Sequence, residues 1–251
     1  DHLHSMASVE ISIRSIAGDT KVLHVPADIS VRELKQRREL FGVPRFLVSL
    51  VADDVVLLDQ CKLCDLQKPI DLSMYKLPYD CGLALGRSLL ASAERGEPIS
   101  VEEILTRPAF PDRPDGAGRT PLIIAAEMAH CDIIRLLLEA EADVERISSR
   151  GQTPLYLAVK SGSVNAVRLL LDAAADCERG CRRVPKSAVT SARQEVVSPL
   201  DLAREIAEES RSAISQHCEE VLKLLLEAQG KRQSTIEQHL NRPASHHITD
   251  L

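Results

Sequence analysis

The stretch Thr120-Pro121-Leu122-Ile123-Ile124-Ala125-Ala126 returns further along the chain as Thr153-Pro154-Leu155-Tyr156-Leu157-Ala158-Val159. The two copies start at 120 and 153, which gives a period of 153 − 120 = 33. The correspondence continues in the same register, because Arg-Leu-Leu-Leu-Glu-Ala at 135–140 is answered by Arg-Leu-Leu-Leu-Asp-Ala at 168–173. Ala142-Asp143 is likewise answered by Ala175-Asp176. A register that holds over a whole unit indicates an internal structural repeat.

Each unit predicts two helices. Thr120 is a favourable N-cap, and Pro121 suits the first helical position, where no backbone donor is lost. Leu122, Ala125 and Ala126 then form an apolar face at helical spacing. A second apolar stripe covers 133–138, and polar connecting residues follow from 142 to 151. One helix pair cannot bury its own apolar stripe, so the units must stack on one another as a solenoid.

These residues closely resemble the ankyrin repeat, in the period of 33, the Thr-Pro-Leu opening, the small alanine pair and the Leu-Leu-Leu second helix. The resemblance implies an all-α solenoid that binds proteins. Its register predicts about four repeats, at 87–119, 120–152, 153–197 and 198–230, of which the first is degenerate. It places Leu89, Ala93, Gly96, Val101 and Leu105 at the positions of Leu122, Ala126, Ala129, Ile134 and Leu138.

The last two units carry insertions. The opening expected at 186 is delayed to Ser198, and the inserted loop holds a cluster of basic residues, Arg179, Arg182, Arg183, Lys186 and Arg193. We interpret this basic loop either as a finger that docks on an acidic partner, a phosphate or RNA, or as a solvated disordered loop. Some ten further residues, placed at 208–217, lengthen or interrupt the last helix pair.

The N-terminal part changes to a period of two. Val9, Ile11 and Ile13 alternate with polar residues, a turn follows at 16–19, and 22–25 completes a hairpin. Asp28-Ile29-Ser30 offers a cap for a helix that ends at Gly42-Val43-Pro44, and strands are predicted at 46–51 and 70–77. This order resembles the ubiquitin-like α+β fold over residues 8–80. Residues 1–7 are expected to be a leader or a leftover of cloning.

The ubiquitin-like segment departs from ubiquitin in two ways. Its last strand continues into the repeats, so there is no free Gly-Gly end and the segment is not a conjugated tag. The apolar patch by which ubiquitin is read maps onto Ile16, Val51 and a polar Ser73. Two interpretations stay open: a docking domain or cap of the solenoid, or a ubiquitin-pathway adaptor that links a client to a ligase or proteasome.

Composition excludes several classes of protein. The chain has 251 residues, of which 44% are hydrophobic, and with aromatics at 2% its core must be aliphatic. A net charge of −6 argues against a nucleic-acid binder as a whole, and no run of about 18 apolar residues predicts a membrane span. The 7 cysteines, without a small disulfide framework, predict reduced thiols and a cytoplasmic or nuclear location.

The sequence contains no complete motif for catalysis or metal binding. Cys61 and Cys64 have metal-ligand spacing but lack a second pair, and Cys177 and Cys181 could join His217 or Cys218 without any spacing that demands it. His130 is expected to be a structural loop residue. No phosphate loop or metalloprotease motif occurs. We therefore predict a non-catalytic protein with no metal, cofactor, small-molecule substrate or membrane partner.

The resemblance implies contacts at the loop tips and the inner helix face. The predicted partner-binding residues are Glu127, Met128, Lys160 and Ser161 on helices, Arg146, Ser149 and Arg150 at a tip, and Tyr156 as an aromatic anchor. A disordered tail is expected from 231 to 251. It ends in Thr249-Asp250-Leu251, which is either the pattern read by PDZ domains or an ordinary frayed end.

Overall fold

The computed structural model of the chain describes residues 8–15, 18–37, 44–52, 55–66, 70–79, 83–183, 195–209 and 216–240. The chain divides into two compact units. The first comprises Asp1–Arg113 together with Leu136–Ala142, and the second comprises Pro114–Arg135 together with Asp143–Leu251.

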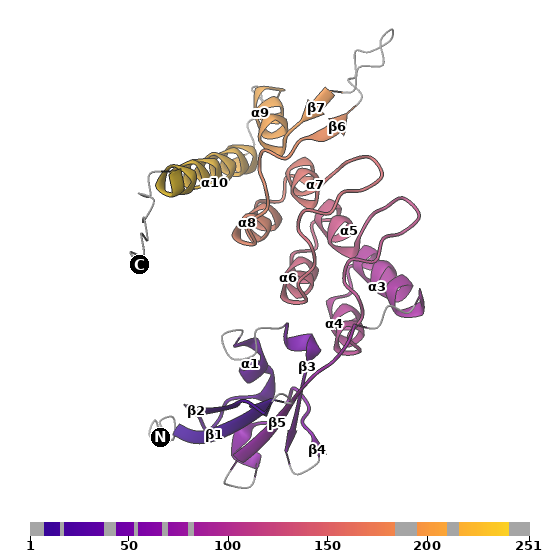
Figure 1. The fold of residues 1–251 in the computed structure, drawn as a ribbon. Coiled ribbons are helices and arrows are strands. Elements are labelled where there is room, and N and C mark those ends of the chain that lie inside the picture. Colours follow the sequence, from indigo (N-terminus) through magenta and orange to yellow (C-terminus); the bar gives the residue numbers. More distant parts are fainter. Residues whose placement is uncertain are drawn as a thin grey trace, which may run out of the picture. The chain divides into compact units, whose positions relative to one another are not determined.

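The first unit begins with a mixed five-stranded sheet (Figure 1). Its strands are β1 (Ser8–Ser15), β2 (Thr20–Pro26), β3 (Val48–Ala52), β4 (Val55–Val56) and β5 (Ile70–Lys76), in the order β2-β1-β5-β3-β4. β1 and β2 form the predicted hairpin, with Val9 opposite Val25 and Ile11 opposite Leu23. β1 also runs parallel to β5, which joins the hairpin to the antiparallel β3–β4 side. This domain is compatible with the ubiquitin-like fold that the sequence predicted.

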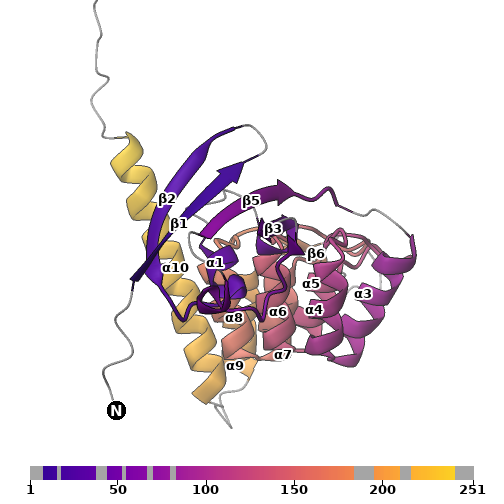
Figure 2. The same cartoon turned by 90° about the horizontal axis from the view of Figure 1, so that it is seen from below.

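One helix covers one face of the sheet (Figure 2). Helix α1 (Val31–Gln36) starts at a capping box, in which Ser30 Oγ accepts from Glu33 N–H and the Glu33 carboxylate accepts from Ser30 N–H. Val31 and Leu34 are fully buried against the inward-facing residues of the strands. The sequence predicted a longer helix, but α1 ends at Gln36, and 38–43 lie outside the described residues.

Two short 3₁₀ helices complete the domain, η1 (Arg45–Leu47) and η2 (Leu63–Asp65). The predicted strand at 46–51 therefore begins late, because the 3₁₀ hydrogen bond from Leu47 N–H to Pro44 O turns the chain before Val48 enters the sheet. The predicted last strand at 70–77 is confirmed as β5.

The helices that follow repeat with the predicted period. They are α3 (Leu83–Arg95), α4 (Pro98–Thr106), α5 (Pro121–Glu127), α6 (Cys131–Glu139), α7 (Pro154–Ser161) and α8 (Val164–Asp172). The second helices of three successive units begin at 98, 131 and 164 and end at 106, 139 and 172, so both ends keep the period of 33. Leu89, Ala93, Val101 and Leu105 are buried, as the register of the degenerate unit predicted.

The backbone conformation repeats as well. Gly96, Ala129 and Gly162 each have positive φ, at 74°, 57° and 71°, at positions that are one period apart. Gly118 and Gly151 also have positive φ one period apart, as do Glu141 and Ala174. A left-handed residue directly after a helix lets the chain reverse and satisfies the last carbonyls. The same turn is therefore built in successive units, with or without glycine.

In the second unit α7 lies between α5 and α9 (Pro199–Glu209) (Figure 1). Strands β6 (Cys181–Arg183) and β7 (Glu195–Val197) form a hairpin at the inserted basic loop, with Cys181 opposite Val197.

The last helix, α10 (Gln216–Leu240), packs against α8 and α9. The sequence predicted disorder from 231, but α10 continues to Leu240, because no proline or capping glycine interrupts 231–240.

The insertion predicted at 208–217 partly lengthens helix α9. α9 has 11 residues where α7 has 8, and its last residues, Glu208 and Glu209, belong to the predicted segment. Residues 210–215 lie outside the described part of the chain, and α10 begins at Gln216.

Candidate protein-interaction surface

Four predicted contact residues lie at the ends of α5 and α7. Glu127 and Lys160 are one period apart and so occupy the same position in two successive units, as do Met128 and Ser161. Glu127, Met128, Lys160 and Ser161 are all exposed. Met128 is the largest apolar member, with 46% of its surface accessible. The two helices contact each other, so these four residues belong to one surface.

The two helices that carry this surface both begin at a side-chain cap. Thr120 Oγ1 accepts from Ile123 N–H and Thr153 Oγ1 accepts from Tyr156 N–H, with the threonines buried and a proline at the next position. Both caps have the form that the sequence predicted. Because each helix is anchored at its first turn, its exposed end is presented at a defined place.

Two connecting loops lie side by side: the first tip, residues 114–119, precedes α5, and the second tip, residues 143–152, precedes α7. The first tip is closed by the hydrogen bond from Asp115 N–H to Arg119 O (2.9 Å), and Ser149 N–H from the next tip donates to Ala117 O (3.0 Å). Partial burial by itself raises the pKa of Asp115. Hydrogen bonds from Arg119 and from Ala117 N–H outweigh that effect and hold this pKa below its ordinary value. Asp115 is therefore a carboxylate at neutral pH, and it stiffens the tip.

The second tip carries the other predicted contacts. Arg146, Ser149 and Arg150 are exposed, and Arg146 Nε lies 3.5 Å from Asp143 Oδ2. The sequence reasoning missed Ile147, which is 49% exposed beside Arg146. An isoleucine within a polar connecting stretch was the signal that could have identified it. It also missed Arg119, whose Nη1 lies 3.7 Å from Glu127 Oε2 and links tip to helix.

Tyr156 is not part of this surface. Its side chain is only 5% exposed, so the prediction that it anchors a partner is wrong. Residues 154–159 of α7, which include Tyr156, are all buried. The helix lies between α5 and α9, and a position that faces outward in an isolated pair is covered in the stack.

The basic loop is described only in part. Arg179 Nη1 donates to Glu145 Oε2 (2.9 Å), so this cation is paired within the second unit. Arg182 and Arg183 belong to β6, and Lys186 and Arg193 lie outside the described residues. Cys177 and Cys181 are buried, and burial raises the pKa of both thiols. Among the residues that the structure describes, no group of three His, Cys, Asp or Glu side chains could hold a metal ion.

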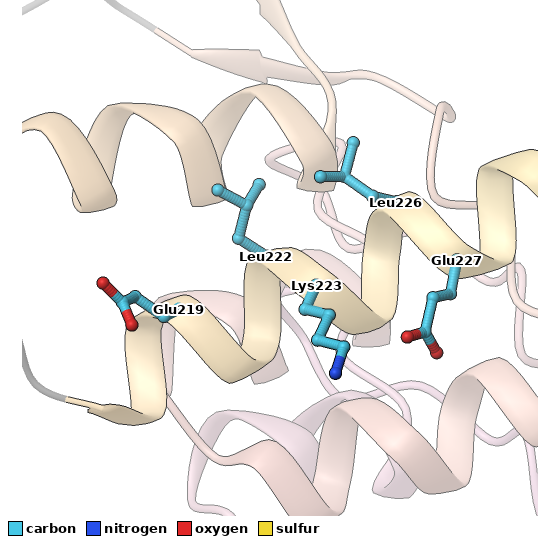
Figure 3. Close-up of a pocket in the computed structure, with 5 residues that line it drawn as sticks. All are labelled: Glu219, Leu222, Lys223, Leu226 and Glu227. Carbon is cyan, nitrogen blue, oxygen red and sulfur yellow. The ribbon is translucent and has the colours of Figure 1, made fainter.

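Residues of α10 line two surface depressions. One is a shallow depression of ≈ 430 Å³ on α10 itself, where Leu222 and Leu226 project from one side and Lys223 and Glu227 from another (Figure 3). The other is a groove of ≈ 720 Å³ between α8, the following loop and α10. Arg232 pairs with Asp176 in this groove, and Gln229 Nε2 donates to Glu178 Oε1 (2.6 Å). Asp176, Glu178 and Arg232 of the groove are therefore engaged by other side chains of the groove.

Two residues of the predicted patch, Val51 and Ser73, lie on the outer face of the sheet. Val51 lies on β3 between Ser73 of β5 and Val56 of β4, and directly opposed residues share a face. Val51 and Ser73 are half-buried, whereas Val56 and Tyr75 are exposed apolar neighbours. Ile16 falls outside the described residues, as do Thr249 and Leu251 of the C-terminal motif.

A family model of ankyrin repeats matches residues 89–180 as three copies. This match confirms the repeat that the sequence predicted, and repeats of this kind generally mediate protein–protein interaction. The chain therefore carries ankyrin repeats after an N-terminal mixed-sheet domain. No curated protein matches the chain. No helix of the described ranges is long and apolar enough to cross a membrane.

Proposed function

We propose that the chain is a non-catalytic scaffold that binds a client protein through the tips and helix ends of its second unit. The binding surface consists of exposed residues from two successive repeats: Glu127, Met128, Arg146, Ser149, Arg150, Lys160 and Ser161. We further propose that α9 and α10 form a fourth repeat, because Ser198 and Pro199 open α9 as Thr153 and Pro154 open α7.

One observation carries the proposal. In the first helices of the two repeats, equivalent buried positions keep apolar or aromatic side chains, as at Leu122 and Leu155 or Ile124 and Leu157. At the exposed ends of these helices the residue type changes, from Glu127 to Lys160 and from Met128 to Ser161. Packing thus dictates the buried set, whereas a mixed array of charge and apolar surface at the helix ends suits recognition of one particular protein.

The test removes the side chains and leaves the stack intact. We expect Met128→Ala/Arg150→Ala/Lys160→Ala to reduce recovery of the partner, first identified by proximity labelling with the unaltered chain, by at least about tenfold. The melting temperature should stay unchanged, because substitutions of exposed residues usually alter stability by no more than about 0.5 kcal/mol. Met128 caps α5 through its backbone N–H, which alanine retains.

The matched control lies on the second helices. Arg135 and Arg168 are exposed on α6 and α8, again one period apart, and Arg135→Ala/Arg168→Ala should leave recovery of the partner unaltered. Equal recovery with the triple variant, or an equal loss with the control, would contradict the proposed surface.

A second candidate function is that of a ubiquitin-pathway adaptor. It is favoured by the run of apolar side chains across adjoining strands on the outer sheet face, Val51, Val56 and Tyr75. Ser73 beside Val51 departs from the apolar character of the ubiquitin patch. The adaptor would present a client on the repeats while this face contacts a ligase or a proteasomal receptor.

Titration of the ¹⁵N-labelled chain with proteasomal receptors of ubiquitin-like domains checks this second function. We expect chemical-shift changes at the amides of Val51, Ser73 and Val56, and a loss of these changes in Val51→Asp, because a charge in an apolar contact is costly to desolvate. The control Val22→Asp alters an exposed valine of β2 on the far side of the sheet order. Shifts confined to other residues would remove the hypothesis.

A further inference from the structure

Arg45 is a buried cation in the first unit. It is the first residue of η1 in the sheet domain, and only 2% of its side chain is exposed. Its guanidinium carbon lies 4.0 Å from the centre of the Phe46 ring. Burying an arginine is unfavourable unless its N–H donors are paired. The residues that accept hydrogen bonds from Arg45 are therefore the ones that it needs to stay buried.

Three carboxylates from three segments surround the guanidinium. Arg45 Nη2 donates to Glu102 Oε1 of α4 (2.8 Å), and Arg45 Nε donates to Glu139 Oε2 at the end of α6 (2.8 Å). The third partner, Asp59 of the sheet domain, is more distant, with Arg45 Nη1 3.4 Å from its Oδ2. The two shortest hydrogen bonds therefore both leave the sheet domain and end on repeat helices.

The neighbouring charges complete a balanced cluster. Arg32 of α1 also pairs with Glu102 (2.7 Å), and Lys35 pairs with Asp59 (2.7 Å). Arg45, Arg32 and Lys35 thus face Asp59, Glu102 and Glu139, three cations against three carboxylates. Without α4 and α6, Arg45 would keep only Asp59, which Lys35 already engages at shorter range.

The segment that connects the sheet domain to the repeats also contacts the C-terminal end of α6. Tyr79, between β5 and α3, donates its hydroxyl to Ala140 O (3.2 Å), and its ring meets Phe110 edge-on with centroids 5.6 Å apart. Burial, and then the carboxylates of Glu141 and Asp112, raise the pKa of Tyr79, so the hydroxyl remains a donor. The link between the sheet domain and the repeats is therefore held independently of Arg45.

We infer that the sheet domain binds in cis to α4 and the C-terminal part of α6, and that Arg45 specifies this docking. The face that carries α1 and η1 is thereby occupied by the repeats of the same chain. A partner of the sheet domain can then read only the opposite, outer face. Buried charge clusters can select one arrangement among several, because every alternative leaves charges unpaired.

The experiment uses the full chain and one variant on each side of the interface. Arg45→Met alters the sheet domain, and Glu102→Gln/Glu139→Gln alters only the helices. We expect both variants to increase the radius of gyration in small-angle X-ray scattering. Amide exchange should rise at least about thirtyfold at Val31–Gln36 and Arg45–Leu47, since truncating one partner of a buried charge pair is strongly destabilising. Ile11 and Ile13, inside the sheet, should keep their protection.

The control Arg14→Met removes an exposed arginine of β1 and should leave radius and exchange unchanged. If neither variant alters them, Arg45 does not specify docking and the inference is overturned. If Arg45→Met also exposes Ile11 and Ile13, the domain itself has unfolded, and the helix variant decides. Faster exchange at Val31–Gln36 in that variant supports docking, and unchanged exchange overturns it.

Discussion

Leu170→Ala is expected to lower the free energy of unfolding by about 2–5 kcal/mol. Leu170 is fully buried in α8, one period after the equally buried Leu137. Removal of three carbon atoms from a packed interior loses their transfer free energy and leaves a cavity whose lining loses its contacts. Urea unfolding followed by circular dichroism at 222 nm measures the loss.

The neighbouring Leu171 provides the matched control. It has the same side chain on the same helix, but it is only half-buried and lines the groove beside α10. Leu171→Ala should therefore cost less than Leu170→Ala, since less apolar surface is uncovered. If the two variants were equally destabilised, α8 would not be oriented with Leu170 toward the interior.

Gly118→Ala is expected to lower the free energy of unfolding by about 2–3 kcal/mol. Gly118 has a φ of +71°, and a Cβ added there would lie 2.9 Å from Ser149 N and 2.8 Å from Ser149 Oγ. The substitution therefore combines left-handed backbone strain with displacement of the next tip, which weakens the hydrogen bond from Ser149 N–H to Ala117 O.

Gly162 separates these two effects. Its φ is also +71°, but nothing lies within 4 Å of the Cβ that a substitution would add. Gly162→Ala should cost only about 1 kcal/mol, the conformational part alone. Chemical denaturation of both variants gives the difference. If Gly162→Ala cost as much as Gly118→Ala, close approach of the two tips would contribute nothing.

The repeat could be predicted because its signals are local. Thr153, Pro154 and the Leu-Leu-Leu stripe act within one or two turns of helix, and the period returns them at the same spacing. For the same reason the degenerate unit was found, since Leu89 and Leu105 keep their register although the opening motif is lost. The predicted contact residues other than Tyr156 are exposed, at the helix ends and tips.

By itself, the sequence determined the period of the repeat, the helix caps, the hairpin of the sheet domain and the aliphatic character of the core. Each of these depends on residues close to one another along the chain. Only the tertiary structure decided that Tyr156 is covered. It also decided that Arg45 meets Glu102 and Glu139, which are 57 and 94 positions away. Burial and ion pairing depend on which segments meet in space, and no local pattern around Arg45 encodes carboxylates that arrive from two distant helices.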